Sequence, residues 1–266
     1  MAVRSALINV MAGAALKAAR GLIRDFGEVE QLQVSIKGPG EFVSSADLKA
    51  EKTLKAELAK ARPGYGFLME ESGTTSGSDA HHRWIIDPLD GTTNFLHGIP
   101  HFAISIGLER DGVAIAGLVY NPAVEEMFIA ERGKGAFLNE QRIRVAARTR
   151  LAEAVIACGL PHLGHGDLAL GRKEAGAMQA EVAGLRRFGA AALDLAWVAA
   201  GRIDAYWERD IKPWDMAAGM VLVREAGGFV SDCNGGDDMY AKGHIASGND
   251  SMHKAVLAVL KAAAKT

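Results

Sequence analysis

The stretch at residues 84–95 reads WIIDPLDGTTNF. Its apolar first residues have the character of a buried strand, and two acidic residues, Asp87 and Asp90, follow directly. Pro88 and Gly91 turn the chain at this point, so both carboxylates can converge on one location. Two carboxylates that converge without a cation repel each other. The stretch therefore predicts a strand that ends in a cation-binding turn.

The expected cation is Mg²⁺, because hard cations take oxygen ligands in near-octahedral geometry. Asp87, Asp90 and the backbone carbonyl of Leu89 are suitable oxygen donors. Gly91 and Thr92 then open a short helix, whose free N–H groups offer a seat for a phosphate oxygen. A metal site and a phosphate seat are thus expected side by side.

Two other acidic stretches fit the same interpretation. Residues 69–72 read MEES, and residues 213–219 read PWDMAAG. Each also has a simpler structural explanation, because Glu70 can lie in a solvated turn and Asp215 can cap the helix that follows. Taken singly, neither stretch decides between a metal ligand and a structural role.

Composition excludes several other classes of protein. Of the 266 residues, 49% are hydrophobic and 23% charged, with a net charge of −2, which predicts neither disorder nor a nucleic-acid-binding surface. The two cysteines, Cys158 and Cys233, lack the spacing of a zinc site or a disulfide framework, so we expect a reducing, cytoplasmic setting. The apolar stretch over residues 6–16 resembles a short signal peptide, but apolar residues recur at helical spacing from Leu7 to Ala18, so we expect an amphipathic helix packed on the domain instead. No stretch is expected to be long and apolar enough to span a membrane.

Hydrophobic periodicity predicts two subdomains that share a cleft. The first, residues 1–143, combines helices with an antiparallel meander and carries most of the acidic stretches. Its expected elements are the N-terminal amphipathic helix, a strand over 31–36, a helix over 44–61, strands over 66–70 and 83–87, and a meander over 102–129. The second, residues 144–266, alternates strands and helices. Its expected elements are a strand near 155, helices over 167–181 and 190–200, a strand over 203–207, a helix over 214–226, strands over 229–230 and 244–246, and a helix from 252.

The long motifs also resemble those of a known family. Two stretches are similar to signature sequences of the inositol monophosphatase family, which belongs to the lithium-sensitive sugar phosphatases. They are residues 84–95 and residues 214–228, which read WDMAAGMVLVREAGG. The similarity runs from Lys37 to residues 189–192. It implies a layered αβαβα sandwich, a homodimer, and Mg²⁺-dependent hydrolysis of inositol monophosphate to inositol and phosphate by a metal-activated water.

The resemblance also implies a set of metal ligands. A first Mg²⁺ would be held by Glu70, Asp87 and the carbonyl of Leu89. A second would be held by Asp87, Asp90 and Asp215, and a third, weaker ion would also use Glu70. Two to three ions are therefore expected.

Catalytic residues follow from the same resemblance. Thr92 and Asp47 are similar to the family's hydrogen-bonded pair that orients and deprotonates the attacking water, and with Glu70 they form the expected catalytic set. Asp47 also fits a helix cap beside Ser44, and both roles are compatible.

The expected substrate-binding residues lie mainly in the second half. By resemblance, Glu208 and Asp90 hydrogen-bond inositol hydroxyls, together with Asp215 and backbone groups around Ala191. The alternative for Glu208 is an exposed carboxylate at the end of a strand.

Two departures from the family pattern bear on the substrate. Met69 stands where many relatives have glycine, and Ala190 replaces a common hydroxyl residue beside the sugar; the first is expected to alter packing only. Alternative substrates are therefore fructose 1,6-bisphosphate, histidinol phosphate and a nucleotide 3′-phosphate. A binding protein in RNA or transcription regulation is an alternative from another class, although composition does not indicate it.

Overall fold

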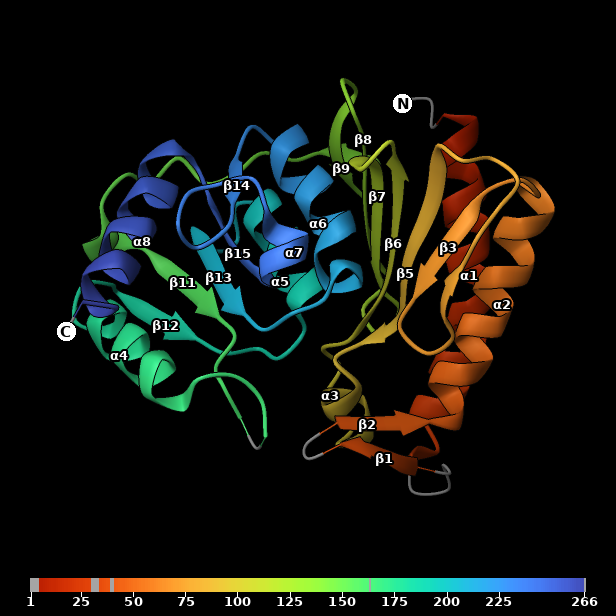
Figure 1. Ribbon diagram of the computed structural model, residues 1–266, viewed down its shortest axis with the longest axis horizontal. Helices are drawn as coiled ribbons and strands as arrows, with labels where there is room; N and C mark the ends of the chain where they lie inside the picture. The colour runs from red at the N-terminus through yellow and green to blue at the C-terminus, as the bar shows by residue number, and fades with distance from the viewer. Residues whose placement is uncertain (1–4, 30–33, 39–40, 163, 266) are drawn as a thin grey trace.

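The computed structural model describes residues 5–29, 34–38, 41–162 and 164–265. They form layers in the order helix, sheet, helix, sheet, helix (Figure 1). Helices α1 and α2 cover one face of a large sheet, α5 and α6 lie between the two sheets, and α4 and α8 cover the outer face of the small sheet. This arrangement confirms the predicted αβαβα sandwich.

The helices of the described residues match most of the expected ranges. They are α1 (Ala6–Phe26), α2 (Ser45–Ala61), α3 (Thr92–Leu96), α4 (Leu168–Gln179), α5 (Ala191–Ala199), α6 (Pro213–Glu225), α7 (Met239–Lys242) and α8 (Asp250–Ala263).

The large sheet has eight strands, and every neighbouring pair is antiparallel except β3 and β5. Its spatial order is β10 (Gln141–Arg142), β9 (Gly135–Leu138), β8 (Glu126–Glu131), β7 (Val113–Asn121), β6 (Ala103–Arg110), β5 (His82–Asp90), β3 (Gly66–Met69) and β4 (Gly73–Thr75). The antiparallel strands β6, β7 and β8 confirm the meander expected over residues 102–129. A separate hairpin joins β1 (Val34–Gly38) to β2 (Glu41–Ser44), and the expected strand over 31–36 lies partly outside the described residues.

The small sheet has five strands and mixed direction. Its order is β12 (Gly184–Arg186), β11 (Val155–Cys158), β13 (Ala205–Arg209), β15 (His244–Gly248) and β14 (Phe229–Ser231). β11 runs parallel to β12 and β13, whereas β15 runs antiparallel to β13 and β14. The parallel pair brings the carboxyl ends of β11 and β13 to the same edge of the sheet.

Helix α1 corrects the expectation that no segment is long and apolar enough for a membrane. It runs from Ala6 to Phe26, and within the described residues it is a helix that meets the length and composition of a membrane span. Length and composition do not separate a membrane span from a core helix. The buried face of α1, with Met11, Ala15 and Leu22, packs in the same core as Leu54 of α2.

The division at residue 143 stays a prediction. The large sheet ends at Arg142 and the small sheet begins at Val155. However, α6 comes from the second half and packs directly on the first-half sheet, so the two halves share one helical layer.

Close contact between α6 and the large sheet depends on two glycines. A Cβ atom on Gly117 would lie 2.3 Å from the carbonyl oxygen of Ala218, and one on Gly107 would lie 2.7 Å from the Cβ of Ala217. Both distances are far below van der Waals contact, so glycine is required at these two strand positions, where the backbone of α6 passes. The glycines set the distance at which α6 approaches β6 and β7.

Gly117→Ala is expected to lower the free energy of unfolding by roughly 1–3 kcal/mol, because the added methyl group meets backbone atoms that cannot rotate away. Gly13→Ala is the matched control, since Gly13 lies on the exposed side of α1 and, apart from the neighbouring backbone of α1 itself, no atom lies within 4 Å of its Cβ position. That variant should gain about 0.5–1 kcal/mol from helix propensity. Thermal or urea unfolding checks both, and similar stabilities for the two variants would contradict this packing.

Candidate active site

Three aspartates converge where β5 ends and α6 begins. One carboxylate oxygen from each of Asp87, Asp90 and Asp215 lies within 4.8 Å of the other two. Residues three apart on a regular strand point to opposite faces, but the pairing of β5 with β6 shifts register between Asp87 and Asp90. Pro88, which has no N–H for the ladder, lies inside this irregularity. The irregular strand end therefore lets both carboxylates face one point.

Asp215 reaches the same point from the first turn of α6. Its Oδ2 accepts a hydrogen bond from the backbone N–H of Lys212 at 2.6 Å, so it also supports the start of the helix. The turn is tied to the large sheet by Ser105, whose hydroxyl donates to the carbonyl of Trp214 at 3.1 Å. Ser105 is the residue paired with Asp87 in the sheet. The capping role of Asp215 and its position in the cluster are thus both present.

Burial makes the cluster electrostatically costly. Asp87 is 3% exposed and Asp90 is 7% exposed. Burial raises the pKa of both carboxyls well above their ordinary value, and the charges of neighbouring carboxylates raise them further. Burial also raises the pKa of Asp215 to about 7. Among the side chains that the structure describes, no lysine or arginine forms an ion pair with any of the three.

These properties fit a divalent metal ion. The donors are hard carboxylate oxygens, and the carbonyl of Leu89 lies between two of them in the sequence. Mg²⁺ prefers such oxygens and keeps part of its water shell, whereas thiolate and imidazole groups suit softer metals. A bound cation would offset the repulsion that raises the pKa values.

Glu70 lies beside this cluster, directly after β3. Its backbone N–H donates to the carbonyl of Ile86 at 3.2 Å, and its charge raises the pKa of both aspartates at the end of β5. Within the described residues, the group of oxygens closer than 4.8 Å contains the aspartates and not Glu70. Glu51 of α2, which the sequence analysis missed, is 5% exposed and accepts the N–H of Glu71 at 2.9 Å. It holds the turn that carries Glu70.

Asp47 and Thr92 are in contact. The hydroxyl of Thr92 lies 3.2 Å from Oδ1 of Asp47 and 3.0 Å from the carbonyl of Leu89, and it can donate to either. Oδ2 of Asp47 accepts the N–H and the hydroxyl of Ser44, at 2.8 and 2.5 Å, which confirms the predicted helix cap. Asp47 is fully buried, and burial raises its pKa, although the Ser44 hydrogen bonds oppose the shift.

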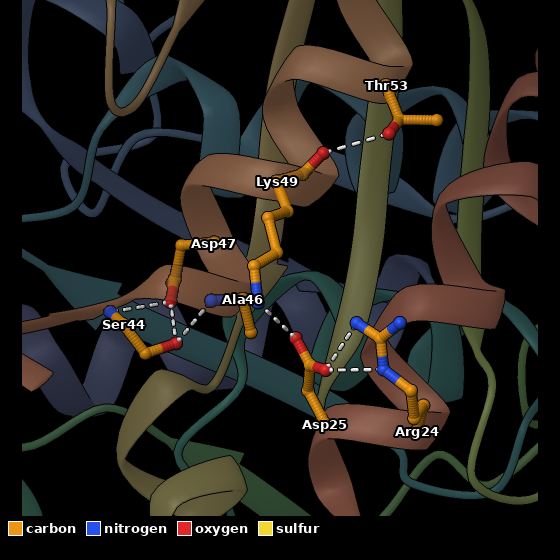
Figure 2. A network of polar contacts seen from close by, with 7 residues as sticks. All are labelled: Arg24, Asp25, Ser44, Ala46, Asp47, Lys49 and Thr53. Carbon is orange, nitrogen blue, oxygen red and sulfur yellow. Dashed lines mark hydrogen bonds and ion pairs between the residues drawn. The ribbon is translucent and has the colours of Figure 1, made fainter. Parts of the chain in front are cut away.

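The helix turn that carries Asp47 is also anchored on α1 (Figure 2). Lys49 donates to Asp25 of α1 at 3.3 Å, and Arg24 donates to the same carboxylate at 2.7 Å. Asp25 is only 5% exposed. Ser44 and Asp25 thus hold the first turn of α2 from two sides. Sequence reasoning missed Asp25, because charged residues on an amphipathic helix usually face water.

Gly91 shapes the predicted phosphate seat at the start of α3. Its φ of +87° lies in the left-handed region, and a Cβ atom there would lie 3.0 Å from the carbonyl oxygen of His101. Asn94 of α3 donates to the carbonyls of His101 and Phe188, both at 2.8 Å. The side chain of Asn94 therefore ties α3 to the segment that leads into α5.

The start of α5 connects directly to the aspartate cluster. The backbone N–H of Ala192 donates to Oδ2 of Asp90 at 2.8 Å. Ala191, the first residue of α5, is 8% exposed, and Ala190 before it is 1% exposed. The methyl group of Ala190 lies 3.2 Å from the Cβ position of Gly91, so this departure from the family pattern fills space beside the predicted phosphate seat.

Glu208 lies at the end of β13 and is partly buried, so the alternative of an exposed strand-end carboxylate is wrong. The hydroxyl of Tyr206 donates to its Oε2. Burial raises the pKa of Glu208 to about 6, although this hydrogen bond opposes the shift. A further acid, Asp194 of α5, was not predicted; burial and the charges of Glu208 and Asp90 raise its pKa well above the ordinary value.

Two other expectations concern residues outside the cluster. Met69 is fully buried in the core shared by α1, α2 and the large sheet, which agrees with an effect on packing alone. Cys158 and Cys233 are buried, and burial raises the pKa of each thiol to about 12. The raised pKa favours the protonated thiol at neutral pH, which agrees with two unreactive, buried cysteines.

Comparison with known proteins identifies the family. The sequence model of the inositol monophosphatase family matches residues 4–265. The chain belongs to the inositol monophosphatase family. Both the predicted family and its fold are therefore confirmed.

Individual members of the inositol monophosphatase family are similar over almost their whole length. An inositol-1-monophosphatase of Mesorhizobium japonicum is 60% identical over 258 residues, which are 97% of each chain. The crystal structure of extragenic suppressor protein suhB from Bartonella henselae has a TM-score of 0.94 and 57% identity, covering 97% of this chain and 99% of that one. The Nus factor SuhB of Pseudomonas aeruginosa is 42% identical over 261 residues, 96% of each chain.

Mg²⁺ is expected to stabilise this family member more strongly as pH rises. The pKa of Asp215 is about 7 in the folded chain against an ordinary value of 3.8, so without metal its protonation stabilises the fold below about pH 4 and this stability is lost as pH rises towards about 7. A cation replaces the lost protons. Thermal melting should therefore show a small Mg²⁺-induced rise in Tm near about pH 5 and a larger one near about pH 8.

Asp90→Asn provides the control for this measurement. Without metal it should melt at a higher temperature than the natural protein at about pH 8, because one repelling charge is gone. It should also lose most of the Mg²⁺-induced rise. A rise that is independent of pH, or that persists in Asp90→Asn, contradicts a cation site at the aspartates.

Proposed function

We propose that this protein hydrolyses inositol monophosphate to inositol and phosphate, with Mg²⁺ as its cofactor. The observation that carries the proposal is the convergence of Asp87, Asp90 and Asp215 beside the glycine turn that opens α3. Inositol-1-monophosphatase is also the name of relatives that are 54–60% identical. A cation-binding acidic cluster next to free helix N–H groups suits the binding of a phosphate monoester.

The proposed metal ligands fall into two groups that share Asp87. Glu70, Asp87 and the carbonyl of Leu89 would hold a first ion, and Asp87, Asp90 and Asp215 would hold a second. A third ion would use Glu70. Bound Mg²⁺ supplies activation of a water molecule and stabilisation of negative charge on the phosphate and the leaving oxygen.

Thr92 and Asp47 are proposed to orient the attacking water. When the hydroxyl of Thr92 donates to Asp47, its oxygen lone pairs are free to accept a hydrogen bond from water. The raised pKa of Asp47 favours transient acceptance of a proton through this pair. Two Ser44 hydrogen bonds keep the carboxylate in place meanwhile.

Binding of the substrate is divided between α3 and the second half of the chain. Gly91 and Thr92 at the start of α3 would hold phosphate oxygens. The alcohol portion would contact Asp90, Ala191, Glu208 and Asp215. A carboxylate such as Glu208 accepts hydrogen bonds from two hydroxyls at once, which suits a polyol better than a simple alcohol.

We further propose that the protein acts in the cytoplasm as a homodimer. Both cysteines are free and buried, which suits a reducing compartment. Dimerisation rests on the family resemblance. Sedimentation velocity would detect a dimer directly.

A second candidate function is a role in transcription. The Pseudomonas aeruginosa relative that is 42% identical carries the name Nus factor, which favours this candidate. Retention of the whole acidic cluster favours the enzyme, because a purely structural partner has no need of buried, mutually repelling carboxylates. Asp90→Asn separates the two candidates. The enzymatic role in the cell requires the Asp90 carboxylate, whereas a binding role in transcription does not.

Phosphate release from inositol 1-phosphate should require Mg²⁺ and stop on chelation. Fructose 1,6-bisphosphate, histidinol phosphate and a nucleotide 3′-phosphate are the comparison substrates, and each should give a lower kcat/KM. A malachite-green assay with and without chelator measures both effects. Full activity after exhaustive chelation would refute the metal-dependent reaction, and a higher kcat/KM for another substrate would change the assignment.

Thr92→Val should lower kcat by roughly 100-fold or more, the range typical of a lost general acid–base contribution. Valine keeps the shape of threonine but cannot bond to Asp47. Thr92→Ser retains the hydroxyl and should keep most of the activity. The Mg²⁺-induced rise in Tm should be unchanged in both variants, because Thr92 is not a proposed ligand. Near-natural kcat in Thr92→Val would remove this pair from the mechanism.

A further inference from the structure

Gly159 lies directly beside Glu208, where the neighbouring strands β11 and β13 of the small sheet end. β11 and β13 run parallel, with Cys158 paired to Trp207, and the N–H of Gly159 donates to the carbonyl of Trp207 at 3.0 Å. Gly159 is thus the next residue along β11, just as Glu208 is the next along β13. Residues that pair in a sheet point to the same face, so position 159 and Glu208 face the same side.

The carboxyl group of Glu208 occupies the space that a side chain at position 159 would fill. A Cβ atom on Gly159 would lie 1.8 Å from Cδ and 1.9 Å from Oε1 of Glu208. The φ angle of Gly159 is not in the left-handed region, so its backbone conformation is open to other residues. Glycine at position 159 therefore leaves the space in which the Glu208 carboxyl group lies, and a side chain there would displace that group.

Tyr206 holds the other oxygen of the same carboxyl group. It lies two residues before Glu208 on β13, which places both side chains on one face of the sheet. Tyr206 is fully buried, and its hydroxyl donates to Oε2. Burial and nearby carboxylates raise the pKa of Tyr206 well above its ordinary value, so the hydroxyl stays protonated and remains a donor.

We propose that Gly159 and Tyr206 are positioning residues that fix the direction of the Glu208 carboxylate and thereby set the preference for polyol phosphates over simple phosphate esters. This inference rests on the proposed function, in which Glu208 contacts the alcohol portion of the substrate. Gly159 leaves the space in which the carboxyl group lies, and Tyr206 fixes its rotation. Neither residue belongs to the proposed metal, water or phosphate site.

The test compares inositol 1-phosphate with glycerol 2-phosphate. Tyr206→Phe, which removes one oxygen and keeps the shape, should lower the ratio of the two kcat/KM values by about 10-fold, since a hydrogen bond to a charged group is lost. Most of that change should appear in KM for inositol 1-phosphate. Gly159→Ala should approach the effect of Glu208→Ala, about 10- to 100-fold, because it displaces the whole carboxyl group.

Double variants show whether the two residues act through Glu208. In a Glu208→Ala background, Gly159→Ala and Tyr206→Phe should each change the ratio by less than about 2-fold, because the group that they position is gone. Further loss of similar size in that background overturns the proposal. So does an equal loss for both substrates in the single variants, which would indicate a general structural role. Tyr206→Phe keeps the test decisive if Gly159→Ala does not fold.

Failure of the proposed function can be distinguished from failure of the positioning claim. If the natural protein releases no phosphate from inositol 1-phosphate, the proposed function is wrong whatever the variants do. The crystal structure of Gly159→Ala then decides the positioning claim by itself. A Glu208 carboxyl group turned away from its natural position supports the claim, and an unmoved carboxyl group overturns it.

Discussion

Buried negative charge, with no ion-paired lysine or arginine among the described side chains, is the constraint on which the site depends. Asp87, Asp90 and Asp215 place carboxylate oxygens within 4.8 Å of one another, and two of them are less than 10% exposed. Such groups normally gain a proton or a cation. The fold thus forms a site at which a bound divalent cation would lower the free energy, and the same cation would supply the electrostatic stabilisation needed to hydrolyse a phosphate ester. The same buried carboxylates thus determine both the stability of the site and its proposed chemistry.

The rest of the fold holds these charges together against their repulsion. The irregular end of β5 turns two carboxylates to one side, and Gly107 and Gly117 let α6 approach closely enough to add the third. Ser105 ties the first turn of α6 to the sheet, and the N–H of Ala192 ties α5 to Asp90. Each device is a backbone contact or a buried hydrogen bond between elements far apart in sequence. The middle helical layer is therefore part of the site as well as part of the core.

Sequence reasoning predicted the parts of this site that lie within continuous motifs. The turn after residue 87 combines acid, proline and glycine in one short stretch, so its convergence follows from local chemistry, and the helix cap of Ser44 with Asp47 is likewise local. Contacts such as Glu51 with the turn after β3, or Asp25 with Lys49, join elements through tertiary packing. A single charged residue on a helix carries no signal of such a partner. The space left by Gly159 could not be predicted from the sequence for the same reason, because it depends on the register between two strands about fifty residues apart.

Crystals grown with Mn²⁺ in place of Mg²⁺ test the central claim most directly, since the anomalous signal of Mn²⁺ locates the ion without reference to activity. The account predicts an anomalous peak in direct coordination distance of carboxylate oxygens from Asp87, Asp90 and Asp215. Hard oxygen ligands of small divalent cations lie about 2.0–2.2 Å away. A peak coordinated by these three carboxylates supports the claim that the buried negative charge forms the catalytic metal site. Anomalous peaks elsewhere with none at the three aspartates would contradict it.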